Sequence, residues 1–236
     1  MKNVGFIFAR GGSKGLRRKN VLQFVDKPLI AHSIELAKRI DELFDVYVST
    51  DDDEIAAVAS KYGAKVIHRP PELATDTAPE WLAWQHAVRV VQHEIGDFEG
   101  FVSLPATSPL RSETDVLSAI EKRDQSGADC CIGITPASRS PYFNMVSQDT
   151  NGIVKIACEP PVLVQRRQDA EPLFDITTVV YAATTSFVLQ KENLFAGTIV
   201  AVTIPKERAV DIDDAIDFEL AELISRRTIS DVPGSL

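Results

Sequence analysis

Short apolar segments alternate with amphipathic helical segments through most of this chain, and each apolar segment ends in a polar loop. Glycine, aspartate, threonine or proline follows most of these segments, and residues with apolar positions three or four apart come next. This order predicts an α/β fold in which helices cover both faces of a mostly parallel central sheet. Ligands bind such sheets beyond the carboxyl ends of the strands. The expected strands are residues 4–8, 45–50, 64–67, 100–104, 128–134, 177–181 and 198–204.

The alternation stops between about residues 138 and 176. Two short apolar stretches, 143–146 and 153–156, flank Asn151-Gly152 there, which predicts a β-hairpin. We interpret residues 1–236 as a single domain with this hairpin as an excursion. Apolar residues on an exposed arm favour packing against a second subunit, so a homodimer is expected. An arm folded back over its own active site is the alternative.

The loop at residues 9–20 follows the first expected strand and reads Ala-Arg-Gly-Gly-Ser-Lys-Gly-Leu-Arg-Arg-Lys-Asn. Its three glycines let backbone N–H groups approach oxygens closely, and its five cationic side chains offset phosphate charge. The loop therefore predicts a polyphosphate site, with a flexible basic surface loop as the alternative. The chain lacks a Walker sequence and a dinucleotide Gly-x-Gly-x-x-Gly sequence, which weakens kinase and hydride-transfer interpretations.

A net charge of −9 argues against a protein that binds nucleic acid or anionic membranes, because both require a broad basic surface. No apolar run approaches the ~20 residues of a membrane span, and the N-terminal run is too short for a secretory signal. A cytoplasmic protein is therefore expected. The cysteines are odd in number and lack metal-ligand spacing, so we expect all three to be inert packing residues: Cys130, Cys131 and Cys158.

Two carboxylates flank an apolar residue in Asp211-Ile212-Asp213, just before the last expected helix. In an extended backbone these carboxylates point to one side and can ligate Mg²⁺. An acidic residue at a helix N-terminus also serves as a cap, and taken alone the cap is the favoured interpretation. Beside a polyphosphate loop the metal interpretation gains weight, because a bound triphosphate needs both cations and a divalent metal.

Five motifs occur in the order found in the acylneuraminate cytidylyltransferases, the CMP-sialic acid synthetases, and the chain resembles that family over nearly its whole length. They are Arg10-Gly11-Gly12-Ser13-Lys14-Gly15 with Lys19-Asn20; Ser49-Thr50-Asp51; Arg69-Pro70 with Glu72-Leu73 and Asp76-Thr77-Ala78; Thr107-Ser108-Pro109-Leu110-Arg111; and Asp211-Ile212-Asp213. The resemblance implies a Rossmann-like nucleotidyltransferase fold, a β-hairpin dimerisation arm and Mg²⁺ dependence. It also implies transfer of CMP from CTP to a nine-carbon 2-keto sugar acid with release of pyrophosphate.

The resemblance also assigns roles by position. The residues that would hold the triphosphate and contact CTP are Arg10, Gly11, Gly12, Ser13, Lys14, Lys19 and Asn20, and Arg10, Lys14 and Asp211 would be catalytic. Arg69 with Asp76, Thr77 and Ala78 would read cytosine and ribose. Asp211 and Asp213 would ligate Mg²⁺, and Asp211 is a hypothetical acceptor for the proton of the sugar hydroxyl. The residues assigned to the sugar are Thr107, Ser108, Arg167 and Gln168.

The chain departs from the family pattern on the sugar side. Pro105-Ala106 stands where these synthetases commonly carry Gln-Pro, and Asp175-Ile176-Thr177-Thr178 stands where they often carry Arg-Pro-Asn-Gly. Legionaminic, pseudaminic or deaminated neuraminic acid is therefore as compatible with the sequence as N-acetylneuraminate. Two other classes remain open: a metal-dependent glycosyltransferase with an Asp-x-Asp motif, and a non-catalytic nucleotide-binding module.

Overall fold

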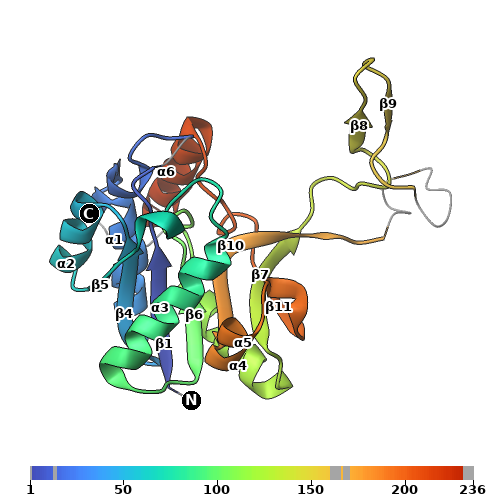
Figure 1. Cartoon of the computed structure of the whole chain (residues 1–236). Coiled ribbons are helices and arrows are strands. Elements are labelled where there is room, and N and C mark those ends of the chain that lie inside the picture. The colour runs from blue at the N-terminus through green and yellow to red at the C-terminus, as the bar shows by residue number, and fades with distance from the viewer. Residues whose placement is uncertain (1, 13–14, 160–165, 167–170, 231–236) are drawn as a thin grey trace.

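The computed structural model describes residues 2–12, 15–159, 166 and 171–230. A seven-stranded sheet forms its centre in the order β11-β7-β10-β6-β1-β4-β5 (Figure 1). All strands run parallel except β10, which is antiparallel to both neighbours, so the expected mostly parallel sheet is confirmed. The strands are β1 (Asn3–Phe8), β4 (Leu43–Thr50), β5 (Lys65–His68), β6 (Gly100–Ser103), β7 (Cys130–Pro136), β10 (Phe174–Thr184) and β11 (Ile199–Thr203).

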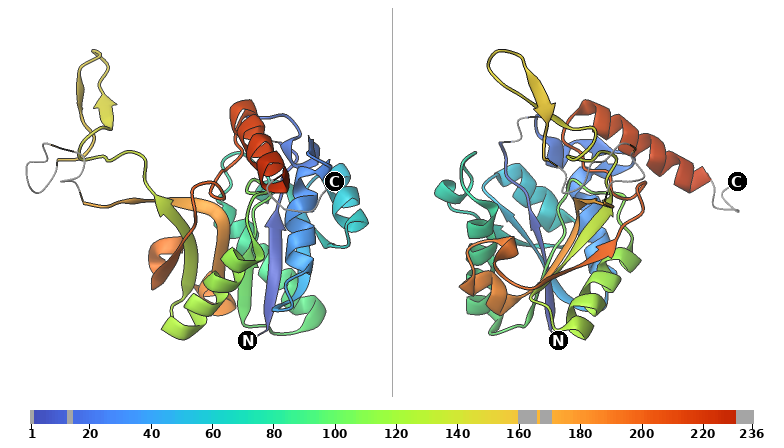
Figure 2. Two further views of the ribbon diagram at one scale, coloured as in Figure 1. Left: turned by 180° about the vertical axis from the view of Figure 1, so that it is seen from behind. Right: turned by 90° about the vertical axis from the view of Figure 1, so that its right-hand side faces the viewer.

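Helices cover both faces of the sheet (Figure 2). Buried residues of α1, α2 and α4 pack on one face, and buried residues of α3 and α5 pack on the other. The last helix, α6, lies beside the amino-terminal part of the chain. The bounds are α1 (Leu29–Lys38), α2 (Asp53–Lys61), α3 (Glu80–Ile95), α4 (Glu113–Ser126), α5 (Thr185–Gln190) and α6 (Ala215–Ser230). Across the part of the chain that the structure describes, no helix combines the length and apolar character needed to cross a bilayer.

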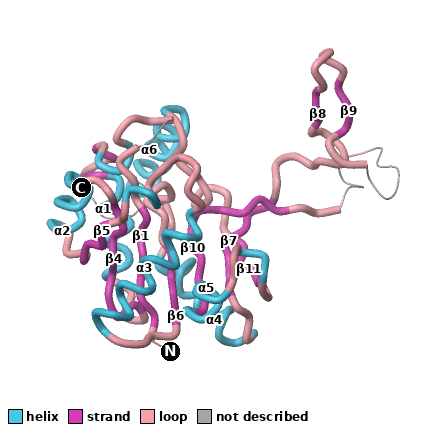
Figure 3. The backbone as a smooth tube through the Cα atoms, viewed as in Figure 1, coloured by secondary structure: helices cyan, strands magenta, loops and turns pink. Residues whose placement is uncertain are grey.

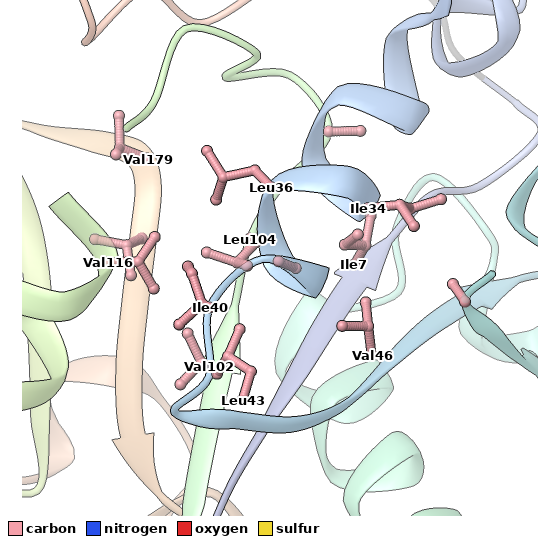
Figure 4. Close-up of a cluster of buried hydrophobic side chains, with 14 of the residues drawn as sticks. Ile7, Ile34, Leu36, Ile40, Leu43, Val46, Val102, Leu104, Val116 and Val179 are labelled. Carbon is pink, nitrogen blue, oxygen red and sulfur yellow. The ribbon is translucent and has the colours of Figure 1, made fainter. Parts of the chain in front are cut away.

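Side chains of the central strands alternate between the two faces. Phe6 packs with Trp84 and the other aromatic residues under α3, whereas Ile7 packs with the aliphatic cluster under α1 (Figure 4). The adjacent Cys130 and Cys131 are divided in the same way, one in each cluster, and burial raises the pKa of both thiols. The prediction of packed, inert cysteines is therefore confirmed for this pair.

A β-hairpin projects from the end of the sheet at which β7 and β10 leave it (Figure 3). It pairs β8 (Val146–Gln148) with β9 (Val154–Ile156), close to the expected positions. The hairpin extends away from the sheet, not back over it, and leaves Val146, Ile153 and Val154 exposed. Cys158 lies just after β9 and is also exposed, so the packing prediction is wrong for this cysteine because the arm has no core to receive it.

Three local sequence patterns fold differently from what they predict: residues 21–24 indicate an extended segment, Pro28 the first residue of a helix, and Ile216, Leu220, Leu223 and Ile224 a core-facing stripe on the last helix. Residues 21–24 are not wholly extended: a 3-10 turn (Lys19–Val21) precedes β2 (Gln23–Phe24), which pairs with β3 (Lys27–Pro28). Pro28 precedes α1 instead of starting it. The last helix forms where expected, but the apolar stripe predicted on it is largely outside the core, with Ile216 76% exposed. Phe218 packs edge-on against Phe24 instead.

Candidate active site

Two neighbouring cavities open at the carboxyl edge of β1, β5 and β6, and they share Phe8 and Arg10. The first, the Arg69 cavity, has a volume of about 270 Å³ and is lined by Phe8, Arg10, Arg69, Leu73, Thr75, Asp76, Ala78 and Glu80. The second, the Lys19 cavity, has a volume of about 310 Å³ and is lined by Phe8, Arg10, Gly15, Lys19, Asn20, Thr107 and Asp213. Motifs far apart in the sequence thus meet at one edge of the sheet.

Arg69 follows β5 and is 8% exposed. Its Nε donates to Ser49 Oγ at 3.1 Å and its Nη2 donates to the Ser49 carbonyl at 2.8 Å, which fixes the guanidinium at the end of β4. Burial lowers the pKa of Arg69, although the carboxylates of Glu80 and Asp51 oppose this effect. The guanidinium lies 5.7 Å from the ring centre of Phe8. A rigid donor beside an aromatic ring is suited to a planar heterocycle.

Four residues that line this cavity had no role assigned from the sequence: Phe8, Leu73, Thr75 and Glu80. Phe8 ends β1 at the carboxyl edge, a position that could have marked it. Glu80 is the first residue of α3 and accepts a hydrogen bond from Trp84 Nε1 at 3.3 Å. Glu80 is exposed as a residue, but desolvation of its carboxyl by the surrounding cavity raises the pKa of that group. Asp76 and Ala78, which were assigned to cytosine and ribose, line the cavity, whereas Thr77, although described, does not.

The basic loop is held against the end of β4 by acidic side chains. The Gly11 N–H donates to Asp51 Oδ1 at 3.0 Å, and Arg18 forms ion pairs with Asp52 and Glu54. Arg10 reaches across the Arg69 cavity, where its Nη1 lies 2.7 Å from Asp76 Oδ1. The loop is therefore attached at several points, which disfavours the alternative of a flexible basic surface loop. The predicted phosphate ligands Ser13 and Lys14 lie outside the described residues.

Lys19 joins this loop to the carboxylate motif near the carboxyl terminus. Its buried ammonium donates to the Ile212 carbonyl and lies 3.3 Å from Asp213 Oδ1. The next residue in the loop, Asn20, donates from Nδ2 to the Arg10 carbonyl at 3.3 Å. The predicted convergence of the phosphate loop with the Asp-Ile-Asp motif is therefore present in the structure.

Asp211 is a half-buried carboxylate of the site. Its Oδ1 is buried and has no hydrogen-bond partner in the described part of the chain. Burial raises the pKa of Asp211 and the nearby Asp213 raises it further, whereas the hydroxyls of Thr107 and Thr178 lower it. Helix α6 is capped by Asp214, whose Oδ1 accepts from the N–H groups of residues 216 and 217, so the cap interpretation of Asp211 and Asp213 is wrong.

The two carboxylates are compatible with a divalent cation. An orphaned oxygen on Asp211 next to the like charge of Asp213 is relieved when a hard cation is bound. Within the described residues no cluster of three or more His, Cys, Asp or Glu side chains has the arrangement of a metal site. The protein would thus supply two carboxylate ligands, and phosphate and water oxygens would supply the others.

The predicted sugar residues divide into described and undescribed ones. Thr107 lines the Lys19 cavity, and its carbonyl accepts from the Ile212 N–H at 2.9 Å. Ser108 is fully buried behind it, and its Oγ lies 2.6 Å from Thr178 Oγ1. Arg167 and Gln168 lie outside the described residues. Thr178 was not assigned to the site from the sequence, because its position beside Ser108 depends on tertiary structure.

The sheet order, the phosphate-type loop and the paired carboxylates define an α/β nucleotidyltransferase. The fold is shared with a CMP:2-keto-3-deoxy-manno-octonic acid synthetase solved with CTP, at a TM-score of 0.69 and 19% identity over 97% of this chain and 100% of that one. It is also shared with 4-diphosphocytidyl-2C-methyl-D-erythritol synthase from Anaerococcus prevotii, at a TM-score of 0.63 and 12% identity over 96% of this chain and 99% of that one.

The chain belongs to the cytidylyltransferase family, whose model matches residues 4–223. It is 34% identical to CMP-N,N'-diacetyllegionaminic acid synthase of Campylobacter jejuni, over 95% of each chain. It is 33% identical to post-translational flagellin modification protein B of Campylobacter coli, over 92% of each chain. It is 32% identical to N-acylneuraminate cytidylyltransferase of Escherichia coli over 96% of this chain, which spans 52% of that protein's length. The resemblance read from the motifs is confirmed.

Proposed function

We propose that this chain transfers CMP from CTP to the anomeric hydroxyl of a nine-carbon 2-keto sugar acid and releases pyrophosphate. One observation carries the proposal: Lys19 ties the phosphate-type loop to the Asp211–Asp213 segment. This contact puts phosphate-binding cations and metal-binding carboxylates in one cavity, directly beside a second cavity suited to a nucleobase. Relatives along the full length of the chain are named as synthases of CMP-sugar acids, which supports this acceptor class.

The nucleotide would span the two cavities. The Arg69 cavity would take cytosine and ribose, with the Arg69 guanidinium as a fixed donor toward the base. The triphosphate would enter the Lys19 cavity, where Arg10, Lys19 and the loop N–H groups offset its charge. Arg10 lines both cavities and would therefore contact the junction between nucleoside and phosphates.

Asp211 and Asp213 would hold Mg²⁺, which when bound would neutralise part of the charge on the phosphate oxygens. In the proposed reaction, the anomeric oxygen forms a bond to the α-phosphorus as the bond from that phosphorus to the β-phosphate oxygen breaks. The electron pair of the broken bond leaves with pyrophosphate, whose charge Arg10 and Lys14 would stabilise. Asp211 is proposed to accept the hydroxyl proton, and an Asp211→Asn protein with full turnover would contradict this role.

The arm supports a homodimeric enzyme. Phe143, Met145, Val146, Ile153 and Val154 are exposed on the projecting hairpin, and a second subunit would bury them. In that dimer Arg167 of one subunit is proposed to bind the sugar carboxylate in the site of the other subunit, and Gln168 is proposed as a further sugar contact. We also propose that the reaction takes place in the cytoplasm, where CTP is available.

The proposal is tested by measuring pyrophosphate release with CTP, Mg²⁺ and a panel of 2-keto sugar acids. The panel contains N-acetylneuraminic, deaminated neuraminic, legionaminic and pseudaminic acids, and ATP, GTP and UTP replace CTP as controls. Release only with CTP and a nonulosonic acid is expected. CTP binding without turnover on the whole panel would indicate a non-catalytic module. Consumption of a preformed nucleotide-sugar without pyrophosphate release would indicate a glycosyltransferase.

A further inference from the structure

Strand β10 contains a bulge where it passes the active site. Ile176 pairs with Ile134 of β7 and Tyr181 pairs with Ile132, so β10 advances five residues while β7 advances two. Val179, which Figure 4 shows, and Val180 are consequently buried in the same cluster. Successive residues of a regular strand would face opposite sides of the sheet. The register leaves residues 177–180 without a ladder partner on β6 or β7, both of which are fully described.

Arg111 supplies the hydrogen bonds that the bulge lacks. Its Nε donates to the Val179 carbonyl at 2.8 Å, and its Nη2 donates to the Thr178 carbonyl at 3.4 Å. The same guanidinium donates to the Pro105 carbonyl and, at 2.7 Å from Nη1, to Ser33 Oγ. Arg111 is 4% exposed, and burial lowers its pKa to about 9. Because this pKa is still above neutral pH, the guanidinium remains charged. It therefore joins β10, the loop after β6 and helix α1.

The position of the bulge determines where the Thr178 hydroxyl lies. Thr178 Oγ1 is 2.6 Å from Ser108 Oγ and 3.5 Å from Thr107 Oγ1, and Thr107 lines the Lys19 cavity. The proposed contacts to the nucleobase come from other elements, with Arg10 after β1 and Arg69 after β5. The groups that Arg111 holds thus belong to the side of the site opposite the base. Bulges beside active sites commonly redirect a side chain in this way.

We infer that Arg111 is a positioning residue for the acceptor half of the site. By holding the β10 bulge against the loop after β6, it fixes the hydroxyls of Thr178 and Thr107 where the sugar acid is bound. The inference rests on the proposed function for the identity of the acceptor. Lysine cannot replace Arg111 here, because one ammonium group cannot reach carbonyls on two segments with the geometry of a planar guanidinium.

The test compares Arg111→Lys with Arg123→Lys. Arg123 is the matched control because it is 1% exposed and donates to the Ala183 carbonyl at 3.0 Å and to Asn3 Oδ1 at 2.9 Å, near the opposite end of the sheet. Both variants are expected to lose stability. Only Arg111→Lys is expected to lower kcat/KM for the sugar acid, by about 10-fold or more, as outer-shell substitutions do. The Kd of CTP measured without Mg²⁺ is expected to stay unchanged in both, because the proposed contacts to the base and phosphates come from Arg69, Arg10 and Lys19.

Two further measurements keep the inference testable if Arg111→Lys folds poorly or the acceptor is wrong. Thr178→Val keeps the side-chain shape and the hydrogen bonds of Arg111 to β10, removes only the Thr178 hydroxyl, and is expected to lower kcat/KM for the sugar acid. Amide hydrogen exchange of residues 177–180 is expected to accelerate in Arg111→Lys and not in Arg123→Lys. Equal sugar kinetics in the two lysine variants, per folded protein, would overturn the inference, as would a parallel loss of CTP affinity measured without Mg²⁺. If wild-type protein uses no 2-keto acid, the proposed function fails, and hydrogen exchange alone decides whether Arg111 holds the bulge.

Discussion

A single methyl group at Gly15 is expected to disrupt the junction between the phosphate loop and the carboxylate motif. A Cβ at this position would overlap the backbone oxygen of Asp213 and lie 3.2 Å from its carbonyl carbon. Because backbone atoms cannot rotate away, the two segments must separate by about 1 Å, and such a displacement in an active site costs about 100-fold in rate. Gly15→Ala is therefore expected to lower kcat/KM about 100-fold, equivalent to roughly 2.7 kcal/mol of transition-state stabilisation.

The assay for Gly15→Ala is pyrophosphate release at varied CTP concentration, combined with calorimetric binding of cytidine. Cytidine lacks phosphates and would occupy only the Arg69 cavity, so its affinity is expected to stay at the wild-type value. Gly12→Ala is the control for the unliganded protein, because a Cβ there meets no atom within 4 Å and should leave Tm unchanged. A Gly15→Ala enzyme with wild-type kcat/KM, or with cytidine affinity reduced in step with activity, would refute the proposed junction.

Three further predictions follow from other parts of the structure. Arg69→Lys is expected to raise the KM for CTP about 10-fold or more in initial-rate kinetics. Lysine cannot form the two hydrogen bonds that Arg69 donates to β4 and also face the base. An unchanged KM would exclude Arg69 from the base site. Asp115→Asn is expected to cost about 1–3 kcal/mol in urea unfolding at pH 7, because Asp115 accepts two hydrogen bonds from Arg208. Burial raises the pKa of Asp115, but hydrogen bonds from Arg208 and Ser112 lower it more, so the folded-state pKa lies below the unfolded-state pKa. The stability contributed by Asp115 is therefore present above the unfolded-state pKa and disappears as the pH falls through the folded-state pKa. A stability difference between wild type and Asp115→Asn that persists at low pH would contradict this prediction. A thiol reagent is expected to react with one cysteine in the native protein and with three in denaturant. Cys158 is exposed in the native protein, whereas Cys130 and Cys131 are buried.

The layered fold could be predicted because its determinants are local. Strand and helix periodicities reported which faces are apolar, and the capping box formed by Ser112 and Asp115 marked the start of α4. Periodicity does not report what covers an apolar face. The apolar residues Ile216 and Leu220 therefore recur at helical spacing in the sequence, but their side chains on α6 are largely exposed in the structure. The bulge in β10 was invisible for a related reason, since Thr177 to Val180 read as an ordinary strand.

The candidate site was predicted where charge and glycine mark it, and missed where only tertiary packing defines it. Arg10, Lys19 and Asp213 meet as expected, because the carboxyl ends of parallel strands lie at one edge. In the sequence Glu80 is indistinguishable from an ordinary first residue of a helix. Its place in the wall of the Arg69 cavity and its raised pKa depend on the tertiary structure. Thr178 likewise acquires its neighbours only through the bulge.

In the proposed reaction, a sugar hydroxyl attacks the α-phosphorus of CTP in this site. The most direct test incubates the protein with CTP, Mg²⁺ and a nonulosonic acid labelled with ¹⁸O at the anomeric hydroxyl, and follows the products by ³¹P NMR. A CMP-sugar whose phosphorus carries the isotope shift of bound ¹⁸O, together with an equal amount of unlabelled pyrophosphate, is the expected result. Formation of CDP, or a CMP-sugar whose phosphorus shows no ¹⁸O shift, would contradict the account.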